Sequence, residues 1–130
     1  VLMQCIFLMG LMTVLWALVG YSLKGAPRGR VGELVDQIGQ IGEHVVALDT
    51  PSGVNVTDGS APGIAVDADA TMTLALPKIG LRDHARVGEL YLADISVPPS
   101  VYTAMGVEHV PDFSTSTLIR VDPDIEPANA

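Results

Sequence analysis

Residues 45–59 read VVALDTPSGVNVTDG, and this stretch decides how the chain folds. Four apolar residues end abruptly at Asp49, and a Pro-Ser-Gly turn begins two residues later. A short continuous apolar run that stops at turn-forming residues is typical of a strand buried in a parallel sheet. Ligands of open α/β sheets bind at the carboxyl ends of the strands. Asp49 and Ser52 are therefore predicted to lie where such a protein does its chemistry.

The composition limits the class of protein. The chain has 130 residues, enough for one domain with a buried core, and only 5% of them are aromatic, so aliphatic side chains must supply the packing. A net charge of −8 with scattered basic residues argues against a nucleic-acid surface. The single cysteine excludes an internal disulfide and favours a reducing, cytoplasmic location. The three histidines lie far apart in the sequence and form no metal-ligand pattern.

The first 23 residues carry no charge. An apolar stretch of this length could span a bilayer, and the basic residues after it would suit a cytoplasmic flank. Polar and small residues interrupt it, however, and no positively charged segment precedes it as in a secretory signal. A buried strand over residues 14–19 explains the pattern as well, and we favour that interpretation over a membrane segment.

The rest of the chain alternates between strand-like and helix-like segments, which predicts an α/β fold with a mostly parallel sheet. Apolar residues recur at helical spacing over residues 31–42, so we expect an amphipathic helix there. The end of the chain is acidic and lacks periodicity, as in a tail or linker. The other expected elements are strands at 45–49, 68–76 and 89–97 and a short helix from Pro98 through Met105.

Four blocks of this sequence resemble, in the same order, the YjeF N-terminal domain family of NAD(P)H-hydrate epimerases, which also includes the apolipoprotein A-I binding protein. They are ALVGYSLKGAPRG (17–29), ALDTPSGVNVTDG (47–59), ADATMTLALPKIGL (68–81) and GELYLADISVP (88–98). The second block looks like the family's DIPSG motif, with Thr50 in place of the usual aliphatic residue. Several blocks at matching intervals are more specific than one short motif. The resemblance implies a Rossmann-like three-layer fold.

The resemblance also implies an activity, the interconversion of the R and S forms of hydrated NADH and NADPH in nicotinamide cofactor repair. Asp49 would be the catalytic residue and would contact the nucleotide, and Ser52 would be a ligand of a bound potassium ion. An aspartate can act as acid and base or stabilise a cationic ring, and hard cations take oxygen ligands. The nucleotide-binding loop would comprise Gly20, Tyr21, Ser22, Leu23, Lys24, Gly25 and Ala26.

Two features depart from the family pattern. Trp16 stands where the family has an aspartate ligand of potassium, and an indole has no acceptor for a cation. The family's first half should also precede the matched blocks, so we expect a domain truncated at its N-terminus. We divide the chain into an apolar leader (1–15), a partial epimerase domain (16–120) and an acidic tail or linker (121–130), and attribute the leader to a frameshift or a misplaced gene start.

Alternatives remain open at this point. Asp49 and Ser52 could serve only as turn formers, because both residue types bond their own backbone in such loops. The chain could be a non-catalytic nucleotide-binding or interaction module of the same fold, or a small membrane-anchored protein. We expect hydrated NADH or NADPH as the substrate, and neither nucleic acid nor a membrane as a partner. The resemblance further implies a homodimer and a fused ADP-dependent dehydratase domain beyond residue 130.

Overall fold

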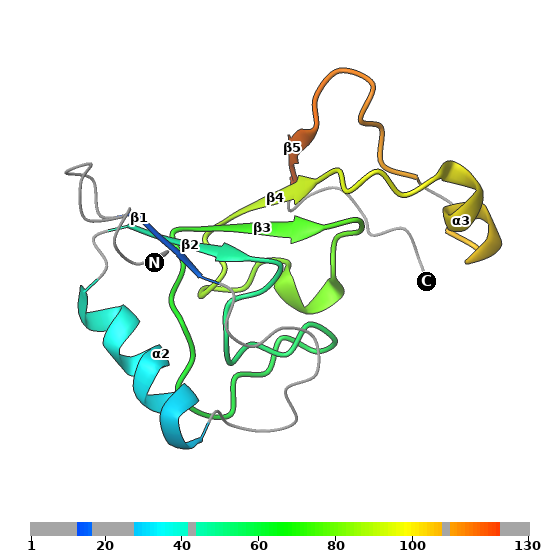
Figure 1. Ribbon diagram of the computed structural model, residues 1–130. Coiled ribbons are helices and arrows are strands. Elements are labelled where there is room, and N and C mark those ends of the chain that lie inside the picture. The colour runs from blue at the N-terminus through cyan, green and yellow to red at the C-terminus, as the bar shows by residue number, and fades with distance from the viewer. Residues whose placement is uncertain (1–12, 17–27, 42–43, 108–109, 123–130) are drawn as a thin grey trace.

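The computed structural model describes residues 13–16, 28–41, 44–107 and 110–122, and a five-stranded sheet lies at its centre (Figure 1). The strands are ordered as in the sequence, the first four run parallel, and the fifth is antiparallel to the fourth. The strands are β1 (Thr13–Trp16), β2 (His44–Leu48), β3 (Ala70–Leu74), β4 (Glu89–Ala93) and β5 (Leu118–Arg120), and the helices are α2 (Gly29–Ile41), the 3-10 helix η1 (Ile79–Leu81) and α3 (Pro99–Ala104).

The expected α/β class with a mostly parallel sheet is confirmed. Helix α2 begins two residues before the predicted helix 31–42 and ends one residue before its end. β2 is shifted by one residue from the predicted strand 45–49, whereas β3 and β4 are shorter than predicted. β3 stops at Leu74 because Ala75 takes a left-handed backbone, and β4 stops before a turn with the same conformation at Ser96. β5 was not expected, since its three residues show no alternation of their own and pair only through β4.

Helix α2 covers one face of the sheet at β2. Its buried residues Val35 and Ile38 pack against Val45 and Ala47 of the strand. These residues recur at helical spacing in α2 and at alternate positions in β2, so each element turns one apolar side to the other. Burial of each such aliphatic side chain contributes about 1.5–3 kcal/mol. This packing holds β2 in the core, directly before the turn that carries Asp49.

Two long loops cover the same face farther along the sheet. A second buried cluster joins Val54 and Val56 of the loop after β2 to Leu81, Val87 and Leu90. No helix forms in the loop 50–67, because it is rich in Gly, Pro, Asp and Asn. The residues that alternate with these along the strands face the other side of the sheet and are half-buried.

Part of the apolar N-terminal stretch belongs to the sheet. β1 pairs with β2 from Thr13 opposite His44 to Trp16 opposite Ala47. These four residues favour the strand interpretation of this stretch, and the rest of the stretch lies outside the described residues. Within the described ranges, the helices are all too short or too polar to cross a membrane.

Candidate active site

β2 and β3 end in the same unusual turn. The residue after each strand, Asp49 for β2 and Ala75 for β3, has a left-handed backbone with φ of 66° and 63°. The next residue donates its N–H to the carbonyl of the last strand residue, at 2.9 Å after β2 and 2.7 Å after β3. This is the rare γ-turn with a positive central φ, and it is strained for any residue but glycine. Strained backbone of this kind gathers at functional sites, so these two turns mark a candidate site.

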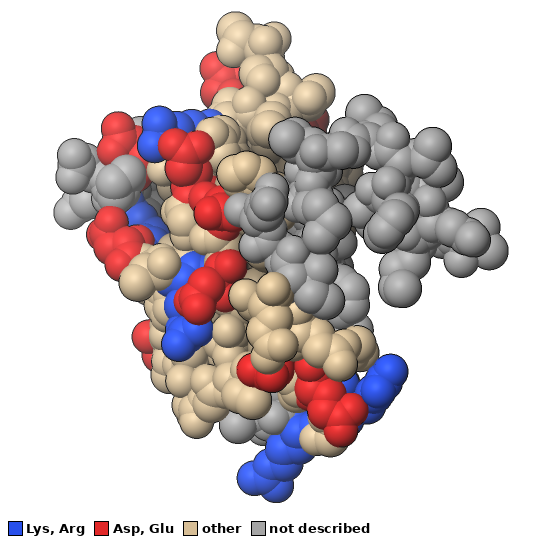
Figure 2. All heavy atoms as spheres, turned by 90° about the vertical axis from the view of Figure 1, so that its left-hand side faces the viewer, with Lys and Arg blue, Asp and Glu red and all other residues tan. Residues whose placement is uncertain are grey.

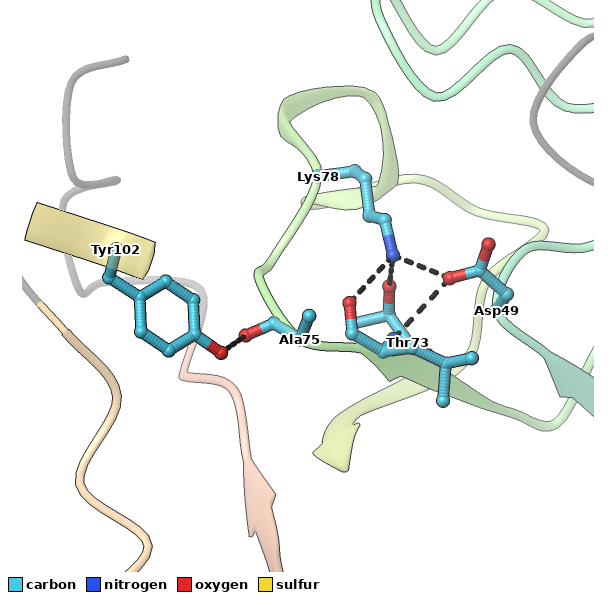
Figure 3. A network of polar contacts seen from close by, with 6 residues as sticks. Asp49, Thr73, Ala75, Lys78 and Tyr102 are labelled. Atoms are coloured by element: carbon cyan, nitrogen blue, oxygen red, sulfur yellow. Dashed lines mark hydrogen bonds and ion pairs between the residues drawn. The ribbon is translucent and has the colours of Figure 1, made fainter. Parts of the chain in front are cut away.

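The two turns bring Lys78 onto Asp49. The Lys78 Nζ donates to Asp49 Oδ1 at 2.5 Å, to Thr73 Oγ1 at 2.9 Å and to the Leu74 carbonyl at 2.9 Å (Figure 3). An ammonium group has three protons, so these acceptors use all of its donor capacity. The backbone N–H of Leu74 lies 3.4 Å from the same Asp49 Oδ1, a long contact.

The Asp49–Lys78 pair is partly shielded from water, and one oxygen of Asp49 has no hydrogen-bond donor among the described residues. The exposed fractions of the two side chains are 26% for Asp49 and 19% for Lys78, and Thr73 beneath them is fully buried. Figure 3 shows the second carboxylate oxygen of Asp49 turned away from the ammonium group, and none of the described residues donates a hydrogen bond to it. Oδ2 is therefore the atom of this pair that is available to a ligand.

Helix α3 supports the turn after β3. The buried Tyr102 donates its hydroxyl proton to the carbonyl of Ala75 at 3.1 Å (Figure 3). Burial raises the pKa of the Tyr102 phenol, and the nearby charge of Asp94 raises it further. The phenol thus stays protonated and keeps donating to the strained turn that positions Lys78.

Two hydroxyl side chains are buried directly after Asp49. Ser52 is 2% exposed and Thr50 is 3% exposed. Ser52 is tied into the loop, because its carbonyl accepts the N–H of Val66 at 2.9 Å. Within the described part of the chain, Thr50 Oγ1 is buried without a hydrogen-bond partner. A buried polar atom of this kind costs about 1–3 kcal/mol, and it calls for a partner such as a water molecule or an ion.

The structure brings together only some of the predicted site residues. Asp49 and Ser52 lie on one turn at the carboxyl end of β2, as the sequence predicts. Trp16 ends the neighbouring strand β1, opposite Ala47, so position 16 also belongs to this edge of the sheet, although its side chain is not described. The whole predicted nucleotide loop, Gly20 to Ala26, lies outside the described residues.

Sequence reasoning did not assign Lys78 or Thr73 to the site. By sequence alone, Lys78 is as consistent with a loop lysine as with a site residue, and Thr73 falls inside a predicted strand. The available signal was the pair of threonines inside the apolar strand ATMTL, followed by Pro-Lys at its end. A buried threonine needs a hydrogen-bond partner, and a lysine beyond the strand end is within reach to supply one.

The opposite edge of the sheet carries a second polar region. A hollow of about 370 Å³ lies at the amino end of β4, with Arg82, His84, Glu89 and Arg120 among its lining residues. Charges of both signs line it, and Arg120 already pairs with Glu89 at 3.0 Å. Asp83 at this hollow also has a left-handed backbone, with φ of 49°, but it takes part in none of the ion pairs among the described residues, whereas Asp49 is held by Lys78. We therefore place the candidate active site at the carboxyl edge.

A parallel sheet with a held carboxylate at its carboxyl edge defines the class, a Rossmann-like α/β domain with a ligand site at that edge. The chain belongs to the family described as YjeF-related protein N-terminus, whose model matches residues 8–80. The match begins inside the stretch 1–15 that we set apart as a leader. The resemblance seen in the sequence is thereby confirmed.

Relatives of this chain are named as enzymes that act on hydrated NAD(P)H. An NAD(P)H-hydrate epimerase of Dehalogenimonas lykanthroporepellens is 46% identical over 109 residues, which cover 83% of this chain and 44% of the relative. One of Truepera radiovictrix is 40% identical over 71% of this chain and 42% of the relative. A bifunctional NAD(P)H-hydrate repair enzyme Nnr of Coxiella burnetii is 38% identical over 68% of this chain and 19% of the relative. The chain thus spans less than half the length of these relatives.

Proposed function

We propose that this chain is an NAD(P)H-hydrate epimerase domain, or part of one, that interconverts the R and S forms of hydrated NADH and NADPH. The observation that carries the proposal is Asp49, held at the carboxyl edge of the sheet by Lys78 with Oδ2 open. The names of relatives at 46% and 40% identity support the choice of reaction.

Asp49 is proposed as the catalytic residue. Epimerisation at the hydrated ring carbon needs a group that moves a proton or an anion that stabilises a cationic ring. A carboxylate with one oxygen tied to an ammonium and the other open suits either role, because it is fixed in place yet still presents an acceptor. The strained backbone at Asp49 supports a functional role over that of a simple turn former.

The remaining substrate contacts are proposed for residues 20–26, which precede α2 in the sequence. Helix α2 begins at Gly29 and packs on β2, so the segment connects the carboxyl end of β1 to the start of this helix. A loop leaving the carboxyl end of a parallel strand is where nucleotides bind in this class of fold. We propose that Gly20 to Ala26 embrace the hydrated nicotinamide nucleotide beside Asp49.

We also propose a potassium site at the turn after β2. The described residues contain no group of three His, Cys, Asp or Glu side chains that could hold a metal, so hydroxyl and carbonyl oxygens are the donors to consider. Ser52 and the Thr50 hydroxyl, which has no hydrogen-bond partner among the described residues, are such donors, and neutral oxygens suit a hard, weakly bound cation. When bound, potassium would supply positive charge beside the nucleotide.

Other properties of the whole protein remain proposals. The bifunctional relatives support a fused ADP-dependent dehydratase domain beyond residue 130. We further propose a cytoplasmic protein that forms a homodimer and binds neither membrane nor nucleic acid. Figure 2 shows acidic and basic side chains interspersed on the side of the molecule that lies to the left in Figure 1, rather than a continuous basic surface.

A non-catalytic binding module is the second candidate, favoured by one observation. Trp16 stands at the carboxyl end of β1, beside the strand that carries Asp49, where the family resemblance implies a potassium-binding aspartate. A domain without that carboxylate would bind the nucleotide and fail to turn it over.

The test uses the native protein, expressed with whatever flanks residues 1–130 at its locus. R/S interconversion of hydrated NADPH is followed by NMR with potassium or sodium present. We expect Asp49→Asn to slow it about 10²–10⁴-fold, the range for a positioned acid or base. Asp67→Asn is the matched control, because Asp67 forms an exposed ion pair with Arg86. Binding without interconversion in the unmutated protein would favour the binding module, and a rate unaffected by Asp49→Asn would exclude Asp49 as the catalytic residue.

A further inference from the structure

We infer that Lys78 is a positioning residue, which fixes Oδ1 of Asp49 and so commits Oδ2 to the substrate. The inference rests on the proposed function and assigns a specific role in it to Lys78, which the sequence alone leaves undecided between a site residue and a loop lysine. The position of Lys78 follows from the strained turn at Ala75, which returns the chain toward the end of β3.

The contacts of the ammonium group exclude a direct role with the substrate. Its three protons are used by Asp49 Oδ1, Thr73 Oγ1 and the Leu74 carbonyl. A lysine that binds phosphate must present at least one proton to the ligand. Lys78 has none to spare in this arrangement, so its charge acts on Asp49 alone.

Lys78 also differs from a surface lysine. The other ion pairs of the described residues have at least one side chain that is more than half exposed, as in Arg30–Glu33 with 77% and 63%. Exposed pairs contribute little, because water screens them and the side chains lose entropy. Lys78 and Asp49 are 19% and 26% exposed, and two further acceptors hold the ammonium on the Asp49 side of the turn.

Without Lys78, little would distinguish the two oxygens of Asp49. Among the described residues, the one other donor to Oδ1 is the Leu74 N–H at 3.4 Å, which is long for a hydrogen bond. The carboxylate would then rotate, and either oxygen could face the fully buried Thr73 or the open side. A reacting group displaced by about 1 Å costs roughly 100-fold in rate, so this loss of position should be visible in catalysis.

The experiment compares Lys78→Met, which keeps an unbranched apolar stem and removes the charged group, with Lys78→Arg in the native protein. We expect Lys78→Met to lower kcat about 100-fold and to change KM by less than about threefold, the pattern of an interaction that acts in the transition state only. Lys78→Arg should recover part of the loss, because it restores a cation that can donate to Asp49. Arg120→Met, at the opposite edge, is the control for removal of one exposed positive charge.

A kcat within about threefold of the unmutated value, or a raised KM at unchanged kcat, would overturn the inference, since the latter would place Lys78 on the substrate. A crystal structure of Lys78→Met decides the positional claim independently of activity. We expect the Asp49 carboxylate to leave its place or to adopt two rotamers, and an unchanged carboxylate would overturn the inference.

If the unmutated protein shows no interconversion, the proposed function fails and this structural result still stands. Should Lys78→Met not fold, Thr73→Val, which removes one acceptor at nearly the same shape, takes its place in both measurements.

Discussion

One aspartate lies at each edge of this sheet, Asp69 at the amino edge and Asp49 at the carboxyl edge, and their carboxylates bond different kinds of group. Asp69, at the amino edge, accepts the Val45 N–H on its Oδ2 at 2.7 Å and donates its own N–H to the Val45 carbonyl at 2.9 Å. Its carbonyl accepts the Glu89 N–H, so this one residue links the starts of three strands. Asp49, at the carboxyl edge, binds Lys78 through Oδ1, while its Oδ2 accepts no hydrogen bond from the described residues.

The difference separates a structural carboxylate from a functional one. Asp69 bonds backbone groups of neighbouring strands, which stabilises the fold. Asp49 bonds a lysine side chain from a strained turn, which costs free energy and presents an oxygen to a ligand. Changes at the carboxyl edge should therefore alter the reaction, and changes at the amino edge should alter the free energy of unfolding.

The largest effect is expected from Asp49→Asn. Interconversion of hydrated NADPH should fall about 10²–10⁴-fold, because the amide can neither move the proton nor stabilise a cation. The melting temperature should stay close to that of the unmutated protein, as measured by calorimetry. If the melting temperature fell as it does for a core substitution while the rate per folded molecule persisted, Asp49 would be a structural residue like Asp69.

Gly88→Ala should be the most destabilising change at the amino edge. Gly88 has φ of 61°, and an added Cβ would lie 2.1 Å from the Asp69 carbonyl oxygen. Left-handed strain and this backbone clash together should cost at least about 2 kcal/mol. Chemical denaturation measures the loss, and Gly106→Ala is the control because its φ is also positive while its Cβ would meet nothing within 4 Å. Equal losses in both variants would show that the clash contributes nothing.

Asp69→Ala should destabilise the protein by about 1–3 kcal/mol, because the Val45 N–H loses its acceptor at the start of β2. The rate of interconversion per folded molecule should not change. Denaturation and the NMR assay on the same samples check both statements. A rate that falls while stability is retained would move the functional edge to the amino end of the strands.

Thr50→Val should have a smaller effect of opposite sign on stability. It removes a buried hydroxyl without a partner among the described residues, so the free energy of unfolding should rise by about 1 kcal/mol in potassium-free buffer. Added potassium should stabilise the unmutated protein more than the variant, if Thr50 is a ligand of the ion. Equal potassium effects in the two proteins, measured by thermal unfolding, would remove Thr50 from the proposed site.

The smallest effect is expected from Tyr102→Phe and concerns pH. Burial raises the pKa of the Tyr102 phenol, so the unfolded chain loses this proton at lower pH than the folded protein does. The stability that results is complete below the ordinary pKa of about 10 and is lost as the pH rises through the folded-state pKa. The melting temperature of the unmutated protein should therefore fall more between pH 8 and about 11 than that of the variant. Tyr91 is present in both proteins and cancels, and parallel curves would contradict this assignment.

The sequence predicts that Asp49 lies at the carboxyl edge of the sheet, but it does not predict the hydrogen bonds that Lys78 and Thr73 form there. The apolar run before Asp49 and the turn residues after it place this carboxylate at a strand end, since both signals are local. Lys78 could not be placed in the same way, because its position depends on the left-handed conformation of Ala75, and alanine gives no signal for that conformation. β5 was missed because its three residues are held by pairing with β4 rather than by any pattern of their own.

The most direct test of the account is an NMR titration of the native protein with hydrated NADPH, read at the backbone amides of the two edges. We predict chemical-shift changes at Asp49, Thr50, Ser52 and Lys78, with the amides of Asp69, Gly88 and Glu89 unaffected. Changes confined to the amino edge, around the hollow lined by Arg82 and Arg120, would contradict the assignment of Asp49 as the residue that meets the substrate.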